Sequence, residues 1–298
     1  MKQRTSAAAR FCAAMLLFGS IGCFVRGIPL PSAQLALCRA LIGAAMLAAA
    51  CLARGGFAPA AVRKDALWLA LSGAALGLNW IFLFEAYRRT TLAAATACYY
   101  CAPVLVLLLA PLVWHEKLPL SGALCALGAA AGAVLVSGVF SAHGAGAANS
   151  GAAGALWGLC AAVFYAAVML LSRFIRHTPA LPRTLAQLVC AAAVLAPYAA
   201  LTHPQPLSAL RLPALLLLLT VGLVHTGAAY LLYFSALPQL PARTVSALSY
   251  IDPAFAILLG AVFLREPMTL PQALGAALIF GCAGAGEVLR RRAAGPAA

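Results

Sequence analysis

Charged residues are scarce in this chain, and their scarcity identifies the solvent in which it folds. Only 9% of its 298 residues are charged, while 64% are hydrophobic; soluble domains carry about 25% charged residues. A soluble fold would leave much of this apolar surface exposed to water, so a soluble domain is excluded. A lipid bilayer solvates such a surface, and the composition therefore predicts an all-α, polytopic membrane protein.

Sequence motifs of the common enzyme classes are also lacking. The chain has no His-Glu-x-x-His, Gly-x-Ser-x-Gly or Gly-x-x-x-x-Gly-Lys-Ser/Thr sequence, which argues against a zinc protease, an α/β-hydrolase and a P-loop NTPase. Its ten cysteines lie almost entirely within apolar runs, where Cys98 and Cys101 favour helix packing over a redox or metal site. We expect no enzyme, no cofactor and no metal. A membrane enzyme and a non-catalytic scaffold or receptor are the alternatives to a transporter.

The net charge of +14 does not indicate a nucleic-acid partner, because the 20 Lys and Arg residues are dispersed at the edges of apolar runs. With the N-terminus in the cytoplasm, fourteen of them lie at the inner ends of the predicted spans and five at the outer ends. Basic residues concentrate on the cytoplasmic side of membrane proteins. This asymmetry predicts a bacterial inner-membrane protein with both termini in the cytoplasm.

Apolar runs of about 17 to 25 residues each match one bilayer crossing. Ten such spans are predicted, at 8–27, 31–53, 66–87, 91–114, 118–140, 154–174, 181–201, 212–235, 241–264 and 268–289. The longest linker, at 141–153, separates a first half (1–140) from a second half (154–298). The sequence therefore predicts two halves of five helices each.

The two halves resemble each other at an offset of 150 residues. The shift aligns the pairs Phe84 and Phe234, Tyr100 and Tyr250, Pro103 and Pro253, and Glu116 and Glu266. Proline and glutamate matches within long apolar runs indicate duplication. Because each half has an odd number of spans, the second half inserts upside down, which gives an inverted repeat with two interconvertible conformations.

The repeated segments resemble the EamA domain of the drug/metabolite transporter superfamily. The first copy reads Phe84-Glu85-Ala86-Tyr87, Ala102-Pro103-Val104 and Trp114-His115-Glu116-Lys117-Leu118, and the second reads Phe234-Ser235-Ala236-Leu237, Asp252-Pro253-Ala254-Phe255 and Leu264-Arg265-Glu266-Pro267. Arg88-Arg89 and the pair Pro238 and Pro241 depart from the usual pattern. The resemblance implies a ten-helix carrier, commonly an exporter of amino acids or other small metabolites.

The function expected from these features is secondary transport of a small solute by alternating access within the lipid bilayer, with protons as a candidate coupling ion. The resemblance and the paired prolines place the solute site between the halves, near the midplane. Spans one, three, four, six, eight and nine would line it, and spans five and ten would be peripheral.

Asp252 is the one acidic residue near the centre of a predicted span. An ionised side chain there costs at least about 2.5 to 3.5 kcal/mol unless it faces a cavity or a partner. Asp252 would contact a substrate amine or couple transport to protons. Alternatively, it forms a packed ion pair, or is a neutral acid bonded to backbone freed by Pro253. The residue at the repeat offset is Ala102, which favours a functional task.

Arg39 is central in span two, and Gln187 stands at roughly the corresponding position of span seven. It would neutralise a carboxylate on the substrate, or else form a structural salt bridge with Asp252 or reach toward the membrane surface.

Prolines and glutamates recur at equivalent heights in the two halves. Pro103 and Pro253 each remove a backbone hydrogen bond, which either frees carbonyls for a solute or is simply tolerated. Glu116 and Glu266 lie at span ends, where helix-end electrostatics or gating contacts are favoured over binding.

Several polar or amphipathic residues in spans three, four, eight and nine would together line a mixed polar and aromatic pocket. Individually, each is as well explained as an interhelical hydrogen bond or an interfacial anchor. These candidates are Asn79, Trp80, Tyr99, Tyr100, His225, Tyr230 and Tyr250.

Overall fold

The computed structural model describes residues 2–114, 120–136, 145–202, 204–240, 248–249 and 251–293. All regular structure in these ranges is helical. Within these ranges, six helices are long and apolar enough to cross a membrane. They are α1 (Lys2–Arg26), α2 (Ser32–Ala53), α4 (Ala66–Arg89), α8 (Ala145–Ser172), α9 (Ala180–Leu201) and the continuous segment Leu212–Ala236. The chain is therefore a multi-pass membrane protein.

The remaining helices are shorter or, like α14 with its 24 residues, apolar over a shorter stretch. These are α3 (Pro59–Lys64), α5 (Leu92–Tyr99), α6 (Ala102–Trp114), α7 (Leu120–Val136), α13 (Ile251–Phe263) and α14 (Leu270–Ala293). Two 3-10 turns, η1 (Leu207–Ala209) and η3 (Leu237–Gln239), flank the segment Leu212–Ala236.

The chain forms two compact units, and each unit draws on both halves of the sequence. Unit 1 comprises Met1–Ile81 and Leu171–Leu259, and unit 2 comprises Phe82–Leu170 and Gly260–Ala298. The two halves predicted from the sequence repeat therefore do not coincide with the two units in which the helices pack.

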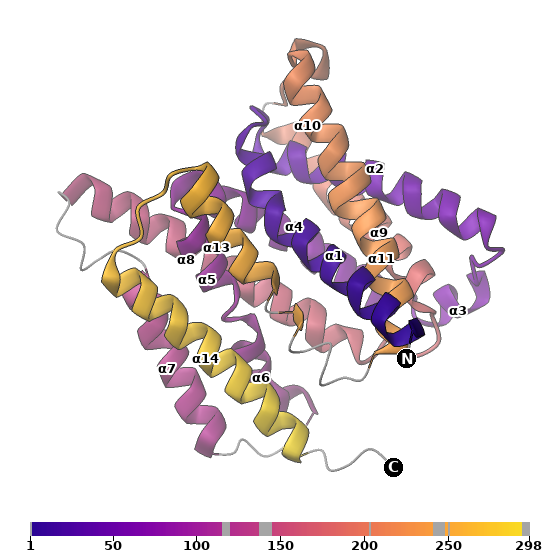
Figure 1. Cartoon of the computed structure of the whole chain (residues 1–298). Coiled ribbons are helices and arrows are strands. Elements are labelled where there is room, and N and C mark those ends of the chain that lie inside the picture. Colours follow the sequence, from indigo (N-terminus) through magenta and orange to yellow (C-terminus); the bar gives the residue numbers. More distant parts are fainter. Residues whose placement is uncertain are drawn as a thin grey trace. The chain divides into compact units, whose positions relative to one another are not determined.

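In unit 1, α2 packs along α9, and α1 packs along α11 (Ala229–Ala236) (Figure 1). Glycines allow α4 to approach α9 closely: a Cβ on Gly73 would lie 2.6 Å from the carbonyl oxygen of Gln187. Small residues at such contacts are typical of membrane helices, because lipid supplies no hydrophobic force between them. Phe11, Met15 and Ala236 belong to the buried cluster between α1 and α11.

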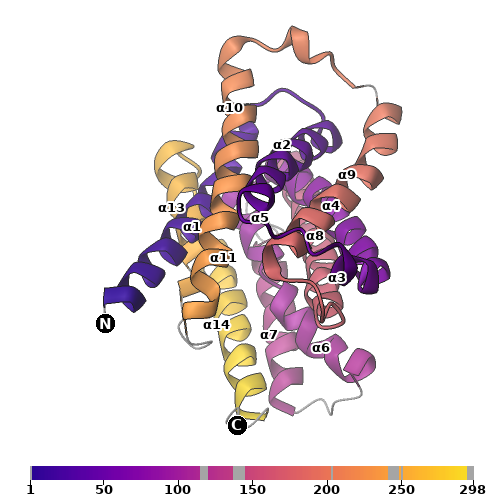
Figure 2. The ribbon, with the colours of Figure 1, turned by 90° about the vertical axis from the view of Figure 1, so that its right-hand side faces the viewer.

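The segment Leu212–Ala236 is one continuous helical rod (Figure 2), and its winding changes in the middle. It begins as α10 (Leu212–Gly222), passes through a π-turn, η2 (Leu223–Ala228), and continues as α11. In the π-turn, the Thr226 hydroxyl donates to the Val221 carbonyl five residues earlier, at 3.0 Å. Turns of this kind occur frequently at functional sites.

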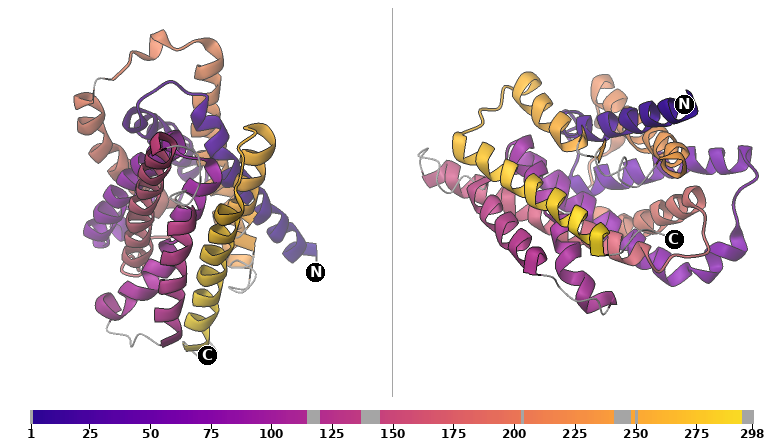
Figure 3. Two further views of the ribbon diagram at one scale, coloured as in Figure 1. Left: turned by 90° about the vertical axis from the view of Figure 1, so that its left-hand side faces the viewer. Right: turned by 60° about the horizontal axis from the view of Figure 1, so that its bottom comes forward.

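In unit 2, α14 lies along α7 (Figures 1 and 3). Glycine again permits the contact, since a Cβ on Gly132 would stand 2.7 Å from the Gly275 carbonyl oxygen. The core of the unit is rich in alanine, with Ala97, Ala129 and Ala162 among its buried residues.

The structure differs from the expected spans at two places. Residues 145–153, predicted as linker, form the first turns of α8, because their alanines favour helix. Span four is interrupted between α5 and α6, at Tyr100 and Cys101. Span nine is not one of these places: α13 begins at Ile251 within it, and 241–247 and 250 lie outside the described residues.

Candidate functional site

A buried cation stands at the π-turn of unit 1. Arg39 of α2 is 5% exposed, and its Nε donates to the Thr226 hydroxyl at 2.7 Å. The centre of its guanidinium lies 4.1 Å from the ring centroid of Trp80, on α4. The Nε–H group and one face of the guanidinium thus make contacts that help to fix the plane of the group.

Glycines bring the π-turn against α2. Gly43 stands one turn beyond Arg39, and a Cβ there would lie 2.5 Å from Cγ2 of Thr226. Gly222 and Gly227 lie equally close to Ile42 and Met46 of α2, respectively. The short bond between Arg39 and Thr226 therefore depends on small residues on both sides of this contact.

His225 extends the polar cluster from the π-turn to α1. Its side chain is 1% exposed, and Nε2 lies 3.0 Å from the Ser20 hydroxyl oxygen. The Ser20 hydroxyl also donates a hydrogen bond to the Leu17 carbonyl oxygen, at 2.9 Å. The ring of Phe24 packs on the imidazole with 4.5 Å between centroids. A titratable group is thus held between a hydroxyl and an aromatic face in an apolar helix bundle.

Five of the residues predicted from the sequence therefore lie in this one region of unit 1. Arg39 and Trp80 are in direct contact, and His225 is adjacent in the chain to the Thr226 that binds Arg39. Asn79 is fully buried beside Trp80 in α4. Tyr230 follows the π-turn by half a turn, is partly exposed, and packs on Phe18 of α1 at 5.4 Å.

Asp252 and Pro253 occupy the first turn of α13. Proline is well tolerated there, because the first N–H groups of a helix have no intrahelical partner. The side chain of Asp252 is partly exposed. Its backbone carbonyl packs directly on Gly19 of α1, where any Cβ would collide with it. Asp252 therefore lies at the start of a helix packed on the same helix that carries Ser20.

Tyr99 and Tyr100 lie in unit 2, with Pro103 close behind. Tyr99 stacks on Tyr165 with 5.0 Å between ring centroids, and Tyr100 packs edge-on to Phe280 at 5.7 Å. Pro103 is the second residue of α6, and the interruption at Tyr100 and Cys101 directly precedes it. These side chains form an aromatic cluster between α5, α8 and α14.

Glu266 caps a helix in unit 2. Its Oε2 accepts a hydrogen bond from the backbone N–H of Leu92, the first residue of α5, at 2.7 Å. The Thr91 hydroxyl accepts from Ala94 at 3.1 Å in the same turn. A carboxylate at this end also complements the helix dipole. Glu116 and Tyr250, predicted as the counterparts of Glu266 and Tyr100, lie outside the described residues.

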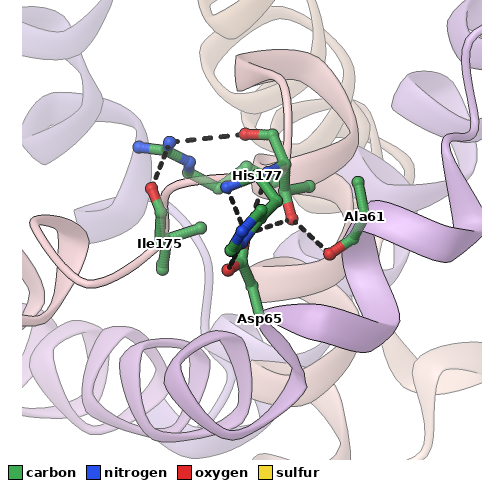
Figure 4. Close-up of polar contacts among 6 residues, drawn as sticks. Ala61, Asp65, Ile175 and His177 are labelled. Carbon is green, nitrogen blue, oxygen red and sulfur yellow. Dashed lines mark hydrogen bonds and ion pairs between the residues drawn. The ribbon is translucent and has the colours of Figure 1, made fainter.

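A second polar cluster lies in unit 1 where the loop after α3 meets the loop after α8 (Figure 4). Asp65 is 2% exposed and accepts from the backbone N–H groups of His177 and Thr178, both at 2.9 Å. The Thr178 hydroxyl donates to the same carboxylate at 2.8 Å. Arg183 then holds the second loop from α9, donating to the Ile175 carbonyl at 2.8 Å.

The exposed His177 ring completes this cluster, with Nδ1 2.8 Å from Oδ1 of Asp65. A carboxylate only accepts hydrogen bonds, so Nδ1 carries the proton. Burial raises the pKa of Asp65, but the hydrogen bonds from His177 and Thr178 outweigh it and hold that pKa well below its usual range. Asp65 is therefore a buried, charged carboxylate whose hydrogen bonds hold the two loops together.

Sequence reasoning missed Ser20, Thr226 and Asp65. The first two are short hydroxyl residues inside apolar runs, and such residues usually bond to their own helix. Asp65 stands next to Lys64 in a short loop, which resembles a solvated position. Only its contact with 177–178, more than a hundred residues later, reveals its role.

Among the residues that the structure describes, no group of three or more His, Cys, Asp and Glu side chains is placed to hold a metal ion. What the described residues do present is a set of apolar, membrane-length helices with a buried polar cluster at a π-turn. The class defined by these features is a multi-pass membrane protein with polar groups kept inside its helices.

The chain belongs to the EamA-like transporter family, whose model matches residues 5–138 and again residues 152–284. It is 33% identical over 297 residues to the Uncharacterized transporter YxxF of Bacillus subtilis, covering 98% of this chain and 92% of that protein. It also resembles a solved crystal structure with a TM-score of 0.64 and 24% identity, covering 97% of this chain and 98% of the other, a likeness of fold alone. The protein is thus a membrane transporter.

Proposed function

We propose that the protein is a secondary carrier that exports a small metabolite, an amino acid or a related compound, across the plasma membrane of a bacterium. It would work by alternating access, with ten spans arranged as two inverted halves. Family membership and the double match of the family model support this proposal. Catalysis has no part in it.

The observation that carries the proposal is the polar cluster of Arg39, Thr226, His225 and Ser20. Burying such groups among apolar helices costs free energy, and polar residues inside membrane proteins mark solute or ion pathways. The cluster joins α1 and α2 of the first sequence half to the π-turn of the second. A carrier whose halves move against each other needs its solute groups at such a junction.

Asp252 and the tyrosines Tyr99, Tyr100 and Tyr230 are further candidates for solute contact, together with Asn79 and Trp80. Asp252 lies in the first turn of α13, directly before Pro253, and its carbonyl packs on Gly19 of α1, next to Ser20. Protons are the coupling ion that Asp252 and His225 would serve, because both side chains titrate.

The test is a flux screen with purified protein in proteoliposomes, over amino acids, amines, sugars and nucleobases, with and without a pH gradient. A carrier gives saturable, protein-dependent flux of at least one solute. A scaffold, receptor or enzyme gives none, and absence of flux across the whole panel would refute the proposal.

A further inference from the structure

We infer that one end of unit 1 binds the headgroups of anionic phospholipids through exposed basic side chains, which together form the basic surface. Its members are Arg54, Arg63, Lys64 and Arg176. Three observations carry the inference: the fold gathers these side chains at one end of the helices, none of them has an acidic partner within the described residues, and apolar and aromatic side chains lie beside them. The inference does not depend on the carrier function.

The packing of α2 along α9 brings two basic segments, 54–65 and 173–183, to the same end of unit 1. Gln34, near the start of α2, donates to the backbone carbonyl of Gln205, in the loop that follows α9, at 2.6 Å. The two helices therefore run in opposite directions, and α2 ends where α9 begins. Arg54 directly follows α2, and Arg176 lies just before α9.

Asp65 joins the two segments directly (Figure 4). Its carboxylate accepts hydrogen bonds from the backbone N–H groups of His177 and Thr178, both at 2.9 Å. Lys64 precedes Asp65, and Arg176 precedes His177. The hydrogen bonds of Asp65 therefore hold the backbone at Lys64 close to the backbone at Arg176, although like charges on the two side chains repel each other.

The charge of the basic surface is not neutralised by the described part of the chain. Segments 54–65 and 173–183 contain six Lys and Arg residues and one acidic residue, Asp65, which is 2% exposed. Among the described residues, no side chain of the basic surface forms an ion pair. In unit 2, by contrast, the exposed Arg89 pairs with Glu85 at 3.1 Å. The basic surface therefore offers its charge to an anion from outside the chain.

Neighbouring apolar side chains indicate that this anion belongs to a lipid. Leu52 and Leu67 lie within three residues of the basic surface and are 69% and 64% exposed. Trp68 stacks on Phe174 with 4.5 Å between ring centroids, and tryptophan is enriched where acyl chains meet headgroups. A phospholipid combines acyl chains with a phosphate group, and this combination matches exposed leucines next to exposed cations.

The chemistry of the headgroup decides which lipids bind. A phosphodiester carries one negative charge, which a guanidinium binds through its planar fork. In a zwitterionic headgroup, an ammonium group balances that charge, so the net attraction to the basic surface is lost. Basic residues concentrate on one side of most membrane proteins, but this rule requires neither that they be gathered by a buried carboxylate nor that they stay unpaired.

The experiment compares phosphatidylglycerol, which is anionic, with phosphatidylcholine of the same acyl chains, which is zwitterionic. Each lipid is titrated into the purified full-length protein in a neutral detergent, and the unfolding temperature gives its affinity. We expect phosphatidylglycerol to bind more tightly, and the difference to shrink as salt rises from about 0.05 to about 0.5 M. Equal stabilisation by the two lipids would overturn the inference.

Inorganic phosphate separates a lipid headgroup from a free anion. It is added at an ionic strength matched with sodium chloride, and we expect it to leave the unfolding temperature unchanged. Stabilisation by phosphate as large as that by phosphatidylglycerol would overturn the assignment to a lipid.

Two double variants locate the effect, Arg63→Gln/Lys64→Gln and Arg54→Gln/Arg176→Gln. Each removes two exposed charges, so the affinity for phosphatidylglycerol should fall about fivefold per charge, or about twentyfold in all. Arg211→Gln is the matched control, because Arg211 is also exposed but lies at the opposite end of unit 1, directly before α10. Wild-type affinity in both double variants, or an equal loss in Arg211→Gln, would overturn the inference.

Discussion

Gly43 and Thr226 are in van der Waals contact in a way that only glycine permits. A Cβ on Gly43 would lie 2.5 Å from Cγ2 of Thr226 and 3.0 Å from its Cβ. The contact seats the π-turn against α2, and one turn earlier on α2 the Nε of Arg39 reaches the Thr226 hydroxyl. A missing side chain thus sets the position of the buried arginine.

Gly43→Ala should therefore destabilise the protein by about 1 to 3 kcal/mol through overpacking. The measurement is thermal unfolding of the purified protein in detergent. Gly281→Ala is the control, because a methyl group added to that helical glycine would have nothing within 4 Å of it, and the change should be neutral or stabilising.

Thr226→Ser provides a compensating change for the same contact, because serine lacks Cγ2 but keeps the hydroxyl that accepts from Arg39. The double variant Gly43→Ala/Thr226→Ser should recover part of the stability lost in Gly43→Ala. If it were no more stable than the single variant, the collision with Cγ2 would not be the cause of the loss.

Asp65→Asn should lower stability by about 1.5 to 3 kcal/mol, because it replaces a carboxylate that accepts several hydrogen bonds. His177→Ala should cost less, since it removes only the exposed ring and leaves both backbone N–H donors in place. Thermal unfolding at neutral pH compares the two. An equal loss in both variants would show that the exposed ring, rather than the buried carboxylate, holds the loops together.

The buried carboxylate of Asp65 also predicts that the stability of the protein depends on pH. The pKa of Asp65 is lower in the folded protein than in the unfolded chain, so its contribution is fully present above the unfolded value, about 4. This contribution of Asp65 to stability is lost as the pH falls toward the pKa of its carboxyl group in the folded protein. The stability difference between wild type and Asp65→Asn should be constant from about pH 5 upward and narrow below about pH 4. A difference that grew on acidification would contradict this assignment.

The helices themselves were predictable, because apolar runs of bilayer length leave few alternatives. The predicted spans 31–53, 66–87 and 181–201 match α2, α4 and α9 within a few residues. The interruption at Tyr100 and Cys101 and the π-turn at 223–228 were not predicted, since both depend on packing that no local pattern records. Arg39, Trp80 and His225 were recognised as polar residues within spans.

The partners of those residues could be identified only from the structure. Ser20 and Thr226 are hydroxyl residues that ordinarily bond within their own helix, and nothing in the sequence pairs Thr226 with Arg39 across 187 positions. Asp65 was missed because a charge in a loop is usually solvated.

Topology gives a further prediction. Because basic residues concentrate at one set of span ends, both termini and the loops at 54–65 and 173–183 should be cytoplasmic, and 141–153 exterior. Cysteines introduced at Ala60 and Arg176, which are exposed, should be labelled only after an impermeant reagent reaches the cytoplasm. A cysteine at Ala147 should be labelled from outside. Labelling of position 147 from the cytoplasmic side alone would invert the arrangement.

Asp252→Asn should insert and fold normally, because the side chain is partly exposed and the residue at the repeat offset is alanine. We expect it to lose solute binding or the pH dependence of transport, since asparagine cannot exchange a proton. Flux at several pH values is compared with that of the wild type at matched protein content. If the flux and its pH profile were unchanged in the variant, Asp252 would contribute to packing and not to transport.

Counterflow tests the central claim of carrier function most directly. Proteoliposomes are loaded with an excess of unlabelled amino acid, diluted into a trace of the labelled compound, and followed for uptake. A carrier that alternates between two open states predicts transient accumulation of label above equilibrium, driven by the outward gradient of unlabelled solute. Label that only equilibrates, or enters no faster than in protein-free liposomes, across the panel of amino acids and related metabolites would contradict the account.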